Sequence, residues 1–231
     1  MLHKALPQIP FKTITYGINS SCEYKAINIK NNGEDGVEFD IILDGEAYHI
    51  KINALGIHNI YNALSAIAIA RNMGIPMEDI ISGIGSFKSG KMRLNIENRG
   101  NYRIINDSYN ASTDSMKASI DVLESVSKDK RSIAVLGDML ELGDYAVLEH
   151  KKVGNYINDK AIDCVVTVGN NAVYIAKELV KKGHNNVYSF SNNKEALYFL
   201  NSFIKKDDII LFKASRGMKL EEIINGLNDG I

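Results

Sequence analysis

The chain has 231 residues, of which 45% are hydrophobic and 24% charged, and its formal net charge is −1. These values are ordinary for a globular protein of one large or two small domains, and they exclude the basic surface that binding nucleic acid or anionic lipid requires. Cys22 and Cys164 have neither disulfide nor metal spacing, residues 2–12 lack the apolar core of a signal peptide, and no apolar run approaches a membrane span. We therefore expect a cytoplasmic protein with no membrane insertion.

The first 52 residues contain short strands joined by turns. Strands are predicted at residues 11–17, 23–30, 37–43 and 47–52. Asp44-Gly45 is a typical two-residue hairpin turn between the last two. This β meander contains no helix and no second layer of its own. It resembles part of a larger domain whose beginning is absent.

Two helices are predicted next. The first covers residues 59–73, with Asn59 as its N-cap, and the second covers residues 77–87. The pattern then changes. We place a domain boundary after residue 90, so that residues 1–90 and 91–231 belong to different domains.

Strands and helices alternate beyond that boundary. A hairpin is predicted across Arg99-Gly100. Further strands recur, with helices between them, at residues 132–137, 164–169, 186–190 and 208–214. This alternation predicts an α/β fold, namely a Rossmann-like, mostly parallel sheet with helices on both faces. Ligands of such sheets bind beyond the carboxyl ends of the strands, so we expect the site among the loops that begin there.

One stretch imitates a phosphate-binding P-loop. Residues 85–92 read GSFKSGKM and nearly match GxxxxGK[ST]. A P-loop follows a buried strand, opens a helix and ends in a Ser or Thr that binds Mg²⁺. This stretch follows a predicted helix, precedes a strand and ends in Met92, so we interpret it as a linker. Neither a GxGxxG fingerprint after a strand nor an HExxH or Ser/His/Asp pattern stands out, and we predict no metal ligands and assign no catalytic residue.

Three polar residues at the start of the 59–73 helix are candidates for binding an adenine base. Asn59 and Asn62 are three residues apart and therefore share a helix face, next to His58. A side-chain amide offers the paired donor and acceptor that an adenine edge requires. The alternative, which the residues alone favour, is that Asn59 caps the helix and Asn62 is solvated.

The strand at residues 102–107 runs directly into a polar loop and a helix. Asp107, Tyr109 and Asn110 are suited to a ribose diol, a ring and a phosphate, respectively. The loop enters the helix N-terminus, which favours anions, with Ser112 or Asp114 as the cap. Because several ligand-suited groups converge there, we favour a binding function over an ordinary polar loop.

A second polar loop follows the strand at residues 132–137. Asp138, Glu141 and His150 lie in the stretch GDMLELGDYAVLEH. Carboxylates and an imidazole suit an ammonium group or Mg²⁺, and they equally suit the capping of the next helix. The sequence does not choose between these two interpretations.

A basic cluster follows the last strand. Lys213, Ser215, Arg216 and Lys219 lie within FKASRGMKLEEI. Arg216 is suited to bind a carboxylate or phosphate with two parallel hydrogen bonds. Lys219 is equally a solvated helix residue, so the binding interpretation is strongest for Arg216.

Four stretches together resemble the Mur ligases in order and spacing: GIHNIYNALSAIAIARNMGI, KMRLNIENRGNYRIINDSYNASTDSM, AVLGDMLELGDYAVLEH and LFKASRGMKLEEII. The resemblance covers nearly the whole chain. It is strongest to the type that joins D-alanyl-D-alanine to UDP-N-acetylmuramoyl-tripeptide. It implies ATP-dependent amide formation through an acyl phosphate during peptidoglycan precursor synthesis, with ATP and Mg²⁺ as cofactors of the full-length enzyme.

The resemblance also implies roles for the residues in the nucleotide-binding stretches. Positions matching Asn59 and Asn62 lie near adenine in the family. Positions matching Arg93 and Asp107 approach the ATP phosphate and ribose, and Asn110 matches a position near the phosphates.

Other parts of the resemblance concern the substrate loops and the extent of the chain. The loops at residues 138–150 and 215–219 resemble those that face the incoming amino compound. Ser112-Thr113 replaces the family's usual Asn-Pro, which leaves that loop less rigid. Residues 1–90 resemble the back half of a central ATPase domain without its P-loop, and residues 91–231 resemble the C-terminal domain. We therefore expect an N-terminally truncated chain that is inactive alone; the alternative is a non-catalytic nucleotide- or partner-binding module with this fold.

Overall fold

The computed structural model of the chain describes residues 12–19 and 21–228. The chain divides into two compact units, one ending at Lys88 and the other beginning at Ser89. Residue 11 of the first predicted strand and nearly all of the 2–12 segment lie outside the described residues. None of the described helices is long and apolar enough to cross a membrane.

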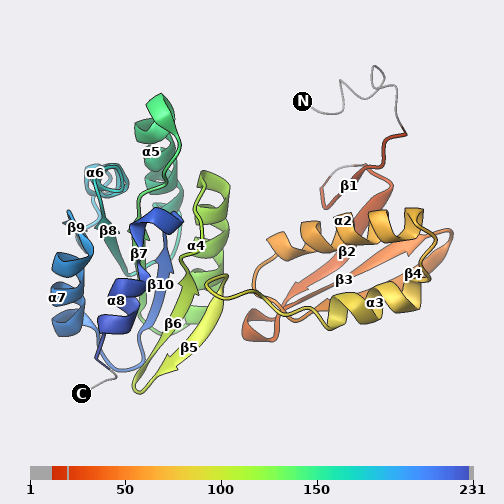
Figure 1. Cartoon of the computed structure of the whole chain (residues 1–231), viewed down its shortest axis with the longest axis horizontal. Coiled ribbons are helices and arrows are strands. Elements are labelled where there is room, and N and C mark those ends of the chain that lie inside the picture. The colour runs from red at the N-terminus through yellow and green to blue at the C-terminus, as the bar shows by residue number, and fades with distance from the viewer. Residues whose placement is uncertain (1–11, 20, 229–231) are drawn as a thin grey trace. The chain divides into compact units, whose positions relative to one another are not determined.

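The first unit contains a four-stranded sheet in the order β1-β2-β3-β4 (Figure 1). Its strands are β1 (Tyr16–Gly17), β2 (Tyr24–Asn31), β3 (Val37–Leu43) and β4 (Glu46–Ile52). β2, β3 and β4 are antiparallel, and the turn predicted at Asp44-Gly45 joins β3 to β4. Both turn residues have positive φ, which a tight hairpin turn of this kind demands. The prediction for the first strand is wrong, because β1 has two residues and pairs parallel to β2.

Two helices supply the second layer of this unit. They are α2 (His58–Asn72) and α3 (Met77–Gly85), and a short 3₁₀ turn (Gly33–Asp35) joins β2 to β3. Alternate residues of β3, including Phe39 and Ile41, point inward against Ile60 and Leu64 of α2. The meander and the two helices therefore share one apolar core.

The second unit contains a six-stranded sheet in the order β5-β6-β10-β7-β8-β9. Its strands are β5 (Asn95–Arg99), β6 (Tyr102–Asp107), β7 (Ser132–Gly137), β8 (Cys164–Val168), β9 (Val187–Phe190) and β10 (Ile209–Lys213). β5 is antiparallel to β6, and all other pairs are parallel. The predicted α/β fold with a mostly parallel sheet is confirmed.

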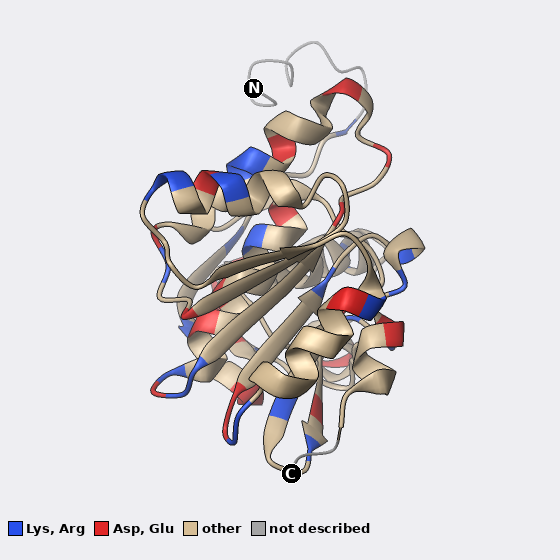
Figure 2. Ribbon diagram, turned by 90° about the vertical axis from the view of Figure 1, so that its left-hand side faces the viewer, with Lys and Arg blue, Asp and Glu red and all other residues tan. Residues whose placement is uncertain are grey.

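Helices cover both faces of this sheet (Figure 1). They are α4 (Thr113–Ser127), α5 (Ala146–Ile157), α6 (Val173–Lys181), α7 (Asn193–Phe203) and α8 (Glu221–Gly226), with 3₁₀ turns at Gly143–Tyr145 and Arg216–Met218. Ala196 and Leu200 of α7 and Ile223 of α8 pack on one face, and α4 and α6 contact the other. The strands are mostly tan in Figure 2, and most of the charged residues lie on helices and turns. This distribution is expected of strands that are buried on both faces.

The carboxyl edge of the second sheet is where polar residues enter the interior. Asp107 and Lys213 end β6 and β10, and Asp138 and Ser215 follow β7 and β10 closely; all four are buried. Ser112 caps α4, as predicted, by accepting a hydrogen bond from the Ser115 amide. The fold thus brings the predicted polar loops of the second unit to one edge.

Candidate functional site

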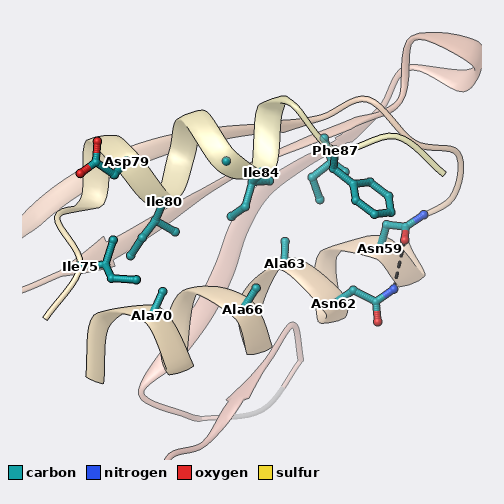
Figure 3. Close-up of a pocket in the computed structure, with 12 residues that line it drawn as sticks. Asn59, Asn62, Ala63, Ala66, Ala70, Ile75, Asp79, Ile80, Ile84 and Phe87 are labelled. Carbon is teal, nitrogen blue, oxygen red and sulfur yellow. Dashed lines mark hydrogen bonds between the residues drawn. The ribbon is translucent and has the colours of Figure 1, made fainter. Parts of the chain in front are cut away.

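The first unit contains a groove of about 430 Å³ between α2 and α3 (Figure 3). The groove is lined mainly by apolar side chains. Alanines of α2 face isoleucines of α3 across it. The residues that line it are Ile52, Asn59, Asn62, Ala63, Ala66, Ala70, Ile75, Asp79, Ile80, Gly83, Ile84 and Phe87. Small pockets of this kind, apolar with a few convergent polar groups, are typical of ligand sites.

Asn59 and Asn62 lie at one end of the groove, beside Phe87, and Asp79 lies at the other end (Figure 3). The Asn59 amide nitrogen donates to the Leu55 carbonyl oxygen (2.8 Å), and the Asn62 amide nitrogen donates to the Asn59 side-chain oxygen (3.0 Å). The prediction that Asn59 caps the helix is wrong, since α2 begins at His58 and its N-cap, Ile57, has no side-chain hydrogen bond. Asn59 instead turns back to the preceding loop, and this contact fixes its amide at the mouth of the groove.

This end of the groove has the chemistry to bind a flat, nitrogen-containing ring. Phe87 is 47% exposed and offers an aromatic face, and Ala63 leaves room beside it. The side chains of Asn59 and Asn62 retain hydrogen-bonding capacity beyond the bonds that they make to each other and to Leu55. His58 opens α2 next to Asn59 but does not line the groove.

In the second unit, Asp107 is the hub of a buried polar network. One of its carboxylate oxygens accepts hydrogen bonds from the Lys213 ammonium (2.6 Å) and the Ser119 hydroxyl (2.6 Å). The other accepts from the Leu94 amide (3.2 Å). Burial lowers the pKa of Lys213, and the nearby Arg93 lowers it further, against the opposing effect of Asp107. Asp107 therefore lies in a polar cluster rather than among apolar side chains, and its carboxylate already holds three partners.

Arg93 and Tyr109 lie against each other, close in sequence to residues of this network. The Arg93 guanidinium carbon lies 4.4 Å from the centre of the Tyr109 ring, a cation–π geometry. The Tyr109 amide donates to the Met92 carbonyl oxygen (3.2 Å), which holds the two segments side by side. The side-chain oxygen of Asn110 accepts a hydrogen bond from the Ala111 amide (2.9 Å), and the Asn110 carbonyl oxygen accepts one from the Lys213 ammonium group (2.9 Å). The structure thus brings together Arg93, Asp107, Tyr109 and Asn110, the residues that the sequence proposes for phosphate and ribose.

Asp138 holds the next loop of the sheet edge. Its carboxylate accepts hydrogen bonds from three successive backbone amides, those of Asn170 (3.2 Å), Asn171 (3.0 Å) and Ala172 (2.6 Å). The residue is 5% exposed. These bonds hold the loop that leads from β8 into α6. Asp138 does not cap the next helix in the chain, α5, whose N-cap has no side-chain hydrogen bond.

His150 and Ser215 shape the loop that follows β7. His150 is fully buried; its Nε2 accepts from the Met139 amide (3.0 Å), and its Nδ1 donates to the Ala146 carbonyl oxygen (2.6 Å). The Ser215 hydroxyl accepts from the Leu140 amide (2.9 Å). Both residues thus hold the backbone of residues 139–140, and both are buried.

Of the residues predicted in the loops after β7 and β10, Glu141, Arg216 and Lys219 are exposed. The Arg216 side chain is 54% exposed and pairs with Glu221 (2.5 Å). Burial tends to raise the pKa of Glu221, but Arg216 outweighs it and holds that pKa below its ordinary value. Glu141 and Lys219 both have left-handed φ angles, 64° and 50°. These three side chains are the ones placed to meet a ligand from solvent.

The sequence did not single out Phe87, and it named Lys213 only as part of a basic cluster, not as a buried partner of Asp107. Phe87 stands in the polar stretch at residues 85–92, and an exposed aromatic there is the signal that was available. Lys213 ends an otherwise apolar strand, where a lysine is rare unless paired. Among the residues that the structure describes, no group of three or more His, Cys, Asp or Glu is arranged to hold a metal ion.

Comparisons with known proteins identify the family of this chain. Residues 92–216 match the model of the Mur ligase glutamate ligase domain, and residues 1–70 match that of the Mur ligase middle domain. The UDP-N-acetylmuramoyl-tripeptide–D-alanyl-D-alanine ligase of Bacillus subtilis is 40% identical over 218 residues, which cover 94% of this chain and 47% of that relative. The chain therefore spans about half the length of the curated relatives that it matches.

Solved structures share the fold. MurF from Acinetobacter baumannii superposes with a TM-score of 0.82 at 28% identity, covering 93% of this chain and 46% of that one. A MurF ligase from Thermotoga maritima, solved in complex with ADP, gives a TM-score of 0.79 at 21% identity, covering 97% and 50%. The glutamate ligase domain model alone matches more than half of the residues. The chain belongs to the Mur ligase family.

Proposed function

We propose that the chain takes part in the ATP-dependent joining of D-alanyl-D-alanine to UDP-N-acetylmuramoyl-tripeptide, a step of peptidoglycan precursor synthesis. The observation that carries this proposal is the 40% identity to the Bacillus subtilis ligase of that name across 94% of the chain. In the proposed reaction, ATP phosphorylates the tripeptide carboxylate to an acyl phosphate. The amine of D-alanyl-D-alanine then attacks that carbonyl carbon and phosphate leaves.

The groove of the first unit is the proposed site of the adenine base. Asn59 and Asn62 supply donor and acceptor groups at its mouth, and Phe87 supplies an aromatic face. The ADP bound in the Thermotoga maritima relative is consistent with an adenine nucleotide as ligand of this fold.

Arg93 and Asn110 are proposed to bind phosphate oxygens, with Asp107 and Tyr109 at the ribose. The exposed cation of Arg93 is suited to phosphate, and Asp107 has unused acceptor capacity for a hydroxyl. Mg²⁺ accompanies ATP in the proposal, but the described residues offer no ligand cluster for it, so we assign it no residue here.

The loops after β7 and β10 are proposed to bind D-alanyl-D-alanine. Arg216 is suited to the dipeptide carboxylate, exchanging its pairing with Glu221 for the ligand. Glu141 and Lys219 complete the exposed polar rim. In this scheme Asp138, His150 and Ser215 act by holding the loop backbones.

The two units are proposed to correspond to the back half of a central ATPase domain (residues 1–90) and a Mur ligase C-terminal domain (residues 91–231). The matches to the middle and glutamate ligase domain models support this division. Residues 85–92 lie between α3 and β5 and end in Met92, so they do not form a P-loop. Since a P-loop supplies much of the stabilisation in phosphoryl transfer, we expect no turnover from this chain alone. Cys22 and Cys164 form no disulfide with each other, which is consistent with action in the reducing cytoplasm.

Calorimetric titration of the chain with ADP tests the nucleotide site without requiring turnover. We expect saturable binding that Asn62→Ala weakens about five- to tenfold, since one hydrogen bond to a ligand contributes on the order of 1 kcal/mol. Asn72→Ala is the matched control, an exposed asparagine at the other end of the same helix. A chain that binds no ADP, or an Asn62→Ala variant that binds as tightly as the unaltered chain, would contradict the proposed adenine site.

A further inference from the structure

Lys213 is a charged residue in the interior of the second unit. It ends β10, a strand with neighbours on both sides, and is 3% exposed. The register of the sheet pairs Lys213 directly with Asp107 at the end of β6. Its ammonium group reaches the Asp107 carboxylate (2.6 Å) and the Asn110 carbonyl oxygen (2.9 Å). One side chain thus fixes both ends of the turn from residue 107 to residue 110.

Through Asp107, the same lysine reaches the segment that carries Arg93. Met92 and Leu94 flank Arg93 and have φ angles of 60° and 52°, which side-chain-bearing residues rarely adopt. Such conformations persist only where surrounding contacts hold them. The Leu94 amide donates to Asp107, and the Met92 carbonyl oxygen accepts from Tyr109, so both contacts come from the turn that Lys213 fixes.

The buried ion pair of Lys213 and Asp107 is not the most stabilising way to fill the space between β6 and β10. Removing an ammonium and a carboxylate from water is costly, and apolar residues of similar volume often stabilise a fold as well or better. Burial lowers the pKa of Lys213 even beside Asp107, so the cost of desolvating the ammonium outweighs the attraction of the carboxylate. The geometry that the pair imposes on its neighbours is therefore the property that explains it best.

We propose that Lys213 is a positioning residue for the nucleotide site. It holds the Asp107–Asn110 turn and, through Asp107, the Arg93–Tyr109 pair in the geometry that receives phosphate and ribose, without touching the ligand itself. The inference rests on the proposed function of that site. Its structural part, that Lys213 orders this turn and the Arg93 segment, concerns the chain without ligand and is measured separately.

The test compares the full chain with its Lys213→Met variant, which keeps the apolar stem and removes the charge. Amide hydrogen exchange followed by NMR is expected to rise about tenfold or more at Leu94 and Tyr109. Exchange in the core strand β8 is expected to stay unchanged. ADP affinity is expected to fall about tenfold. Lys182→Met is the matched control, an exposed lysine at the end of α6.

The outcomes of this comparison distinguish the positioning role of Lys213 from the proposed nucleotide-binding function. Unchanged exchange at Leu94 and Tyr109 in Lys213→Met overturns the inference, and so does unchanged ADP affinity. Exchange that rises equally in β8 also overturns it, because Lys213 then supports the whole unit. If the unaltered chain binds no ADP, the proposed function fails, and the exchange measurement still judges the positioning role. If Lys213→Met does not fold, Lys213→Gln, which keeps a donor, takes its place with the same expected changes.

Discussion

The candidate residues in the groove of the first unit lie on the protein surface, whereas several of those at the polar edge of the second unit are buried. In the groove, Asn62 and Phe87 lie on the surface of an apolar core that is complete without them. At the edge, Asp107, Asp138 and His150 are buried; the two aspartates bond segments that are distant in sequence, and His150 bonds the backbone of its own loop. Ligand affinity and stability are therefore separable in the groove, whereas at the edge one network serves both.

The largest expected effect is a difference in labelling rate between the two cysteines, of which each unit contains one. Cys164 begins β8 and is 2% exposed, and burial raises its pKa to about 12, which leaves about 1000-fold less thiolate at neutral pH than an ordinary thiol has. Cys22 in the first unit is only partly buried. We expect a disulfide reagent to label Cys22 and to label Cys164 at least ~100-fold more slowly in the folded chain.

Mass spectrometry of the labelled chain and of a Cys22→Ser variant measures the two rates separately. Both thiols are expected to react at similar rates in denaturant. Fast labelling of Cys164 in the folded Cys22→Ser chain would show that the core of the second unit opens as readily as the periphery of the first, and the contrast between the units would then fail.

An intermediate effect is expected for Asp138→Ala at the edge. The substitution leaves three backbone amides without their acceptor, and we expect the free energy of unfolding to fall by about 3 kcal/mol. Urea denaturation followed by circular dichroism measures this change. Asp144→Ala, an exposed carboxylate on the same loop, is the control and is expected to change it by less than about 0.5 kcal/mol. Equal midpoints for the two variants would mean that Asp138 does not support the loop.

The smallest effect is expected for Phe87→Ala in the groove. Because Phe87 is 47% exposed, stability is expected to change little, while the loss of an aromatic surface weakens ADP binding about tenfold. Calorimetry and urea denaturation of the same variant measure the two quantities, with Tyr198→Ala on α7 as an exposed aromatic control. A large loss of stability without a change in affinity would place Phe87 in the core instead of the ligand site.

Much of the fold was predictable because its signals are local. The alternation of strands and helices after residue 91, the hairpin at Asp44-Gly45 and the Ser112 cap all follow from neighbouring residues. The strand order was not predictable, since inserting β10 between β6 and β7 depends on contacts between residues about a hundred positions apart. The parallel pairing of β1 was not predictable for a different reason: it involves only two residues, too few to give a pattern in the sequence.

The candidate site was predictable in its location but not in its contacts. Parallel strands bring their carboxyl ends to one edge, so Asp107, Asp138 and Ser215 were expected there. Their partners come from other loops: Asp138 bonds the entrance to α6, and His150 bonds the Met139 amide across its own loop. Whether a carboxylate meets a ligand or a backbone amide depends on this tertiary arrangement, which residue type and spacing do not contain.

The central position of β10 has a consequence for how the chain is made. β10 leaves the ribosome after every other described strand of this sheet, yet β6 and β7 have no shared neighbour until it arrives. Until then, both strands present unpaired backbone groups beside apolar side chains, the condition under which nascent chains associate wrongly. A chain that stops before Ile209 is thus expected to aggregate rather than to fold in part, because the sheet is closed from its middle by its final strand.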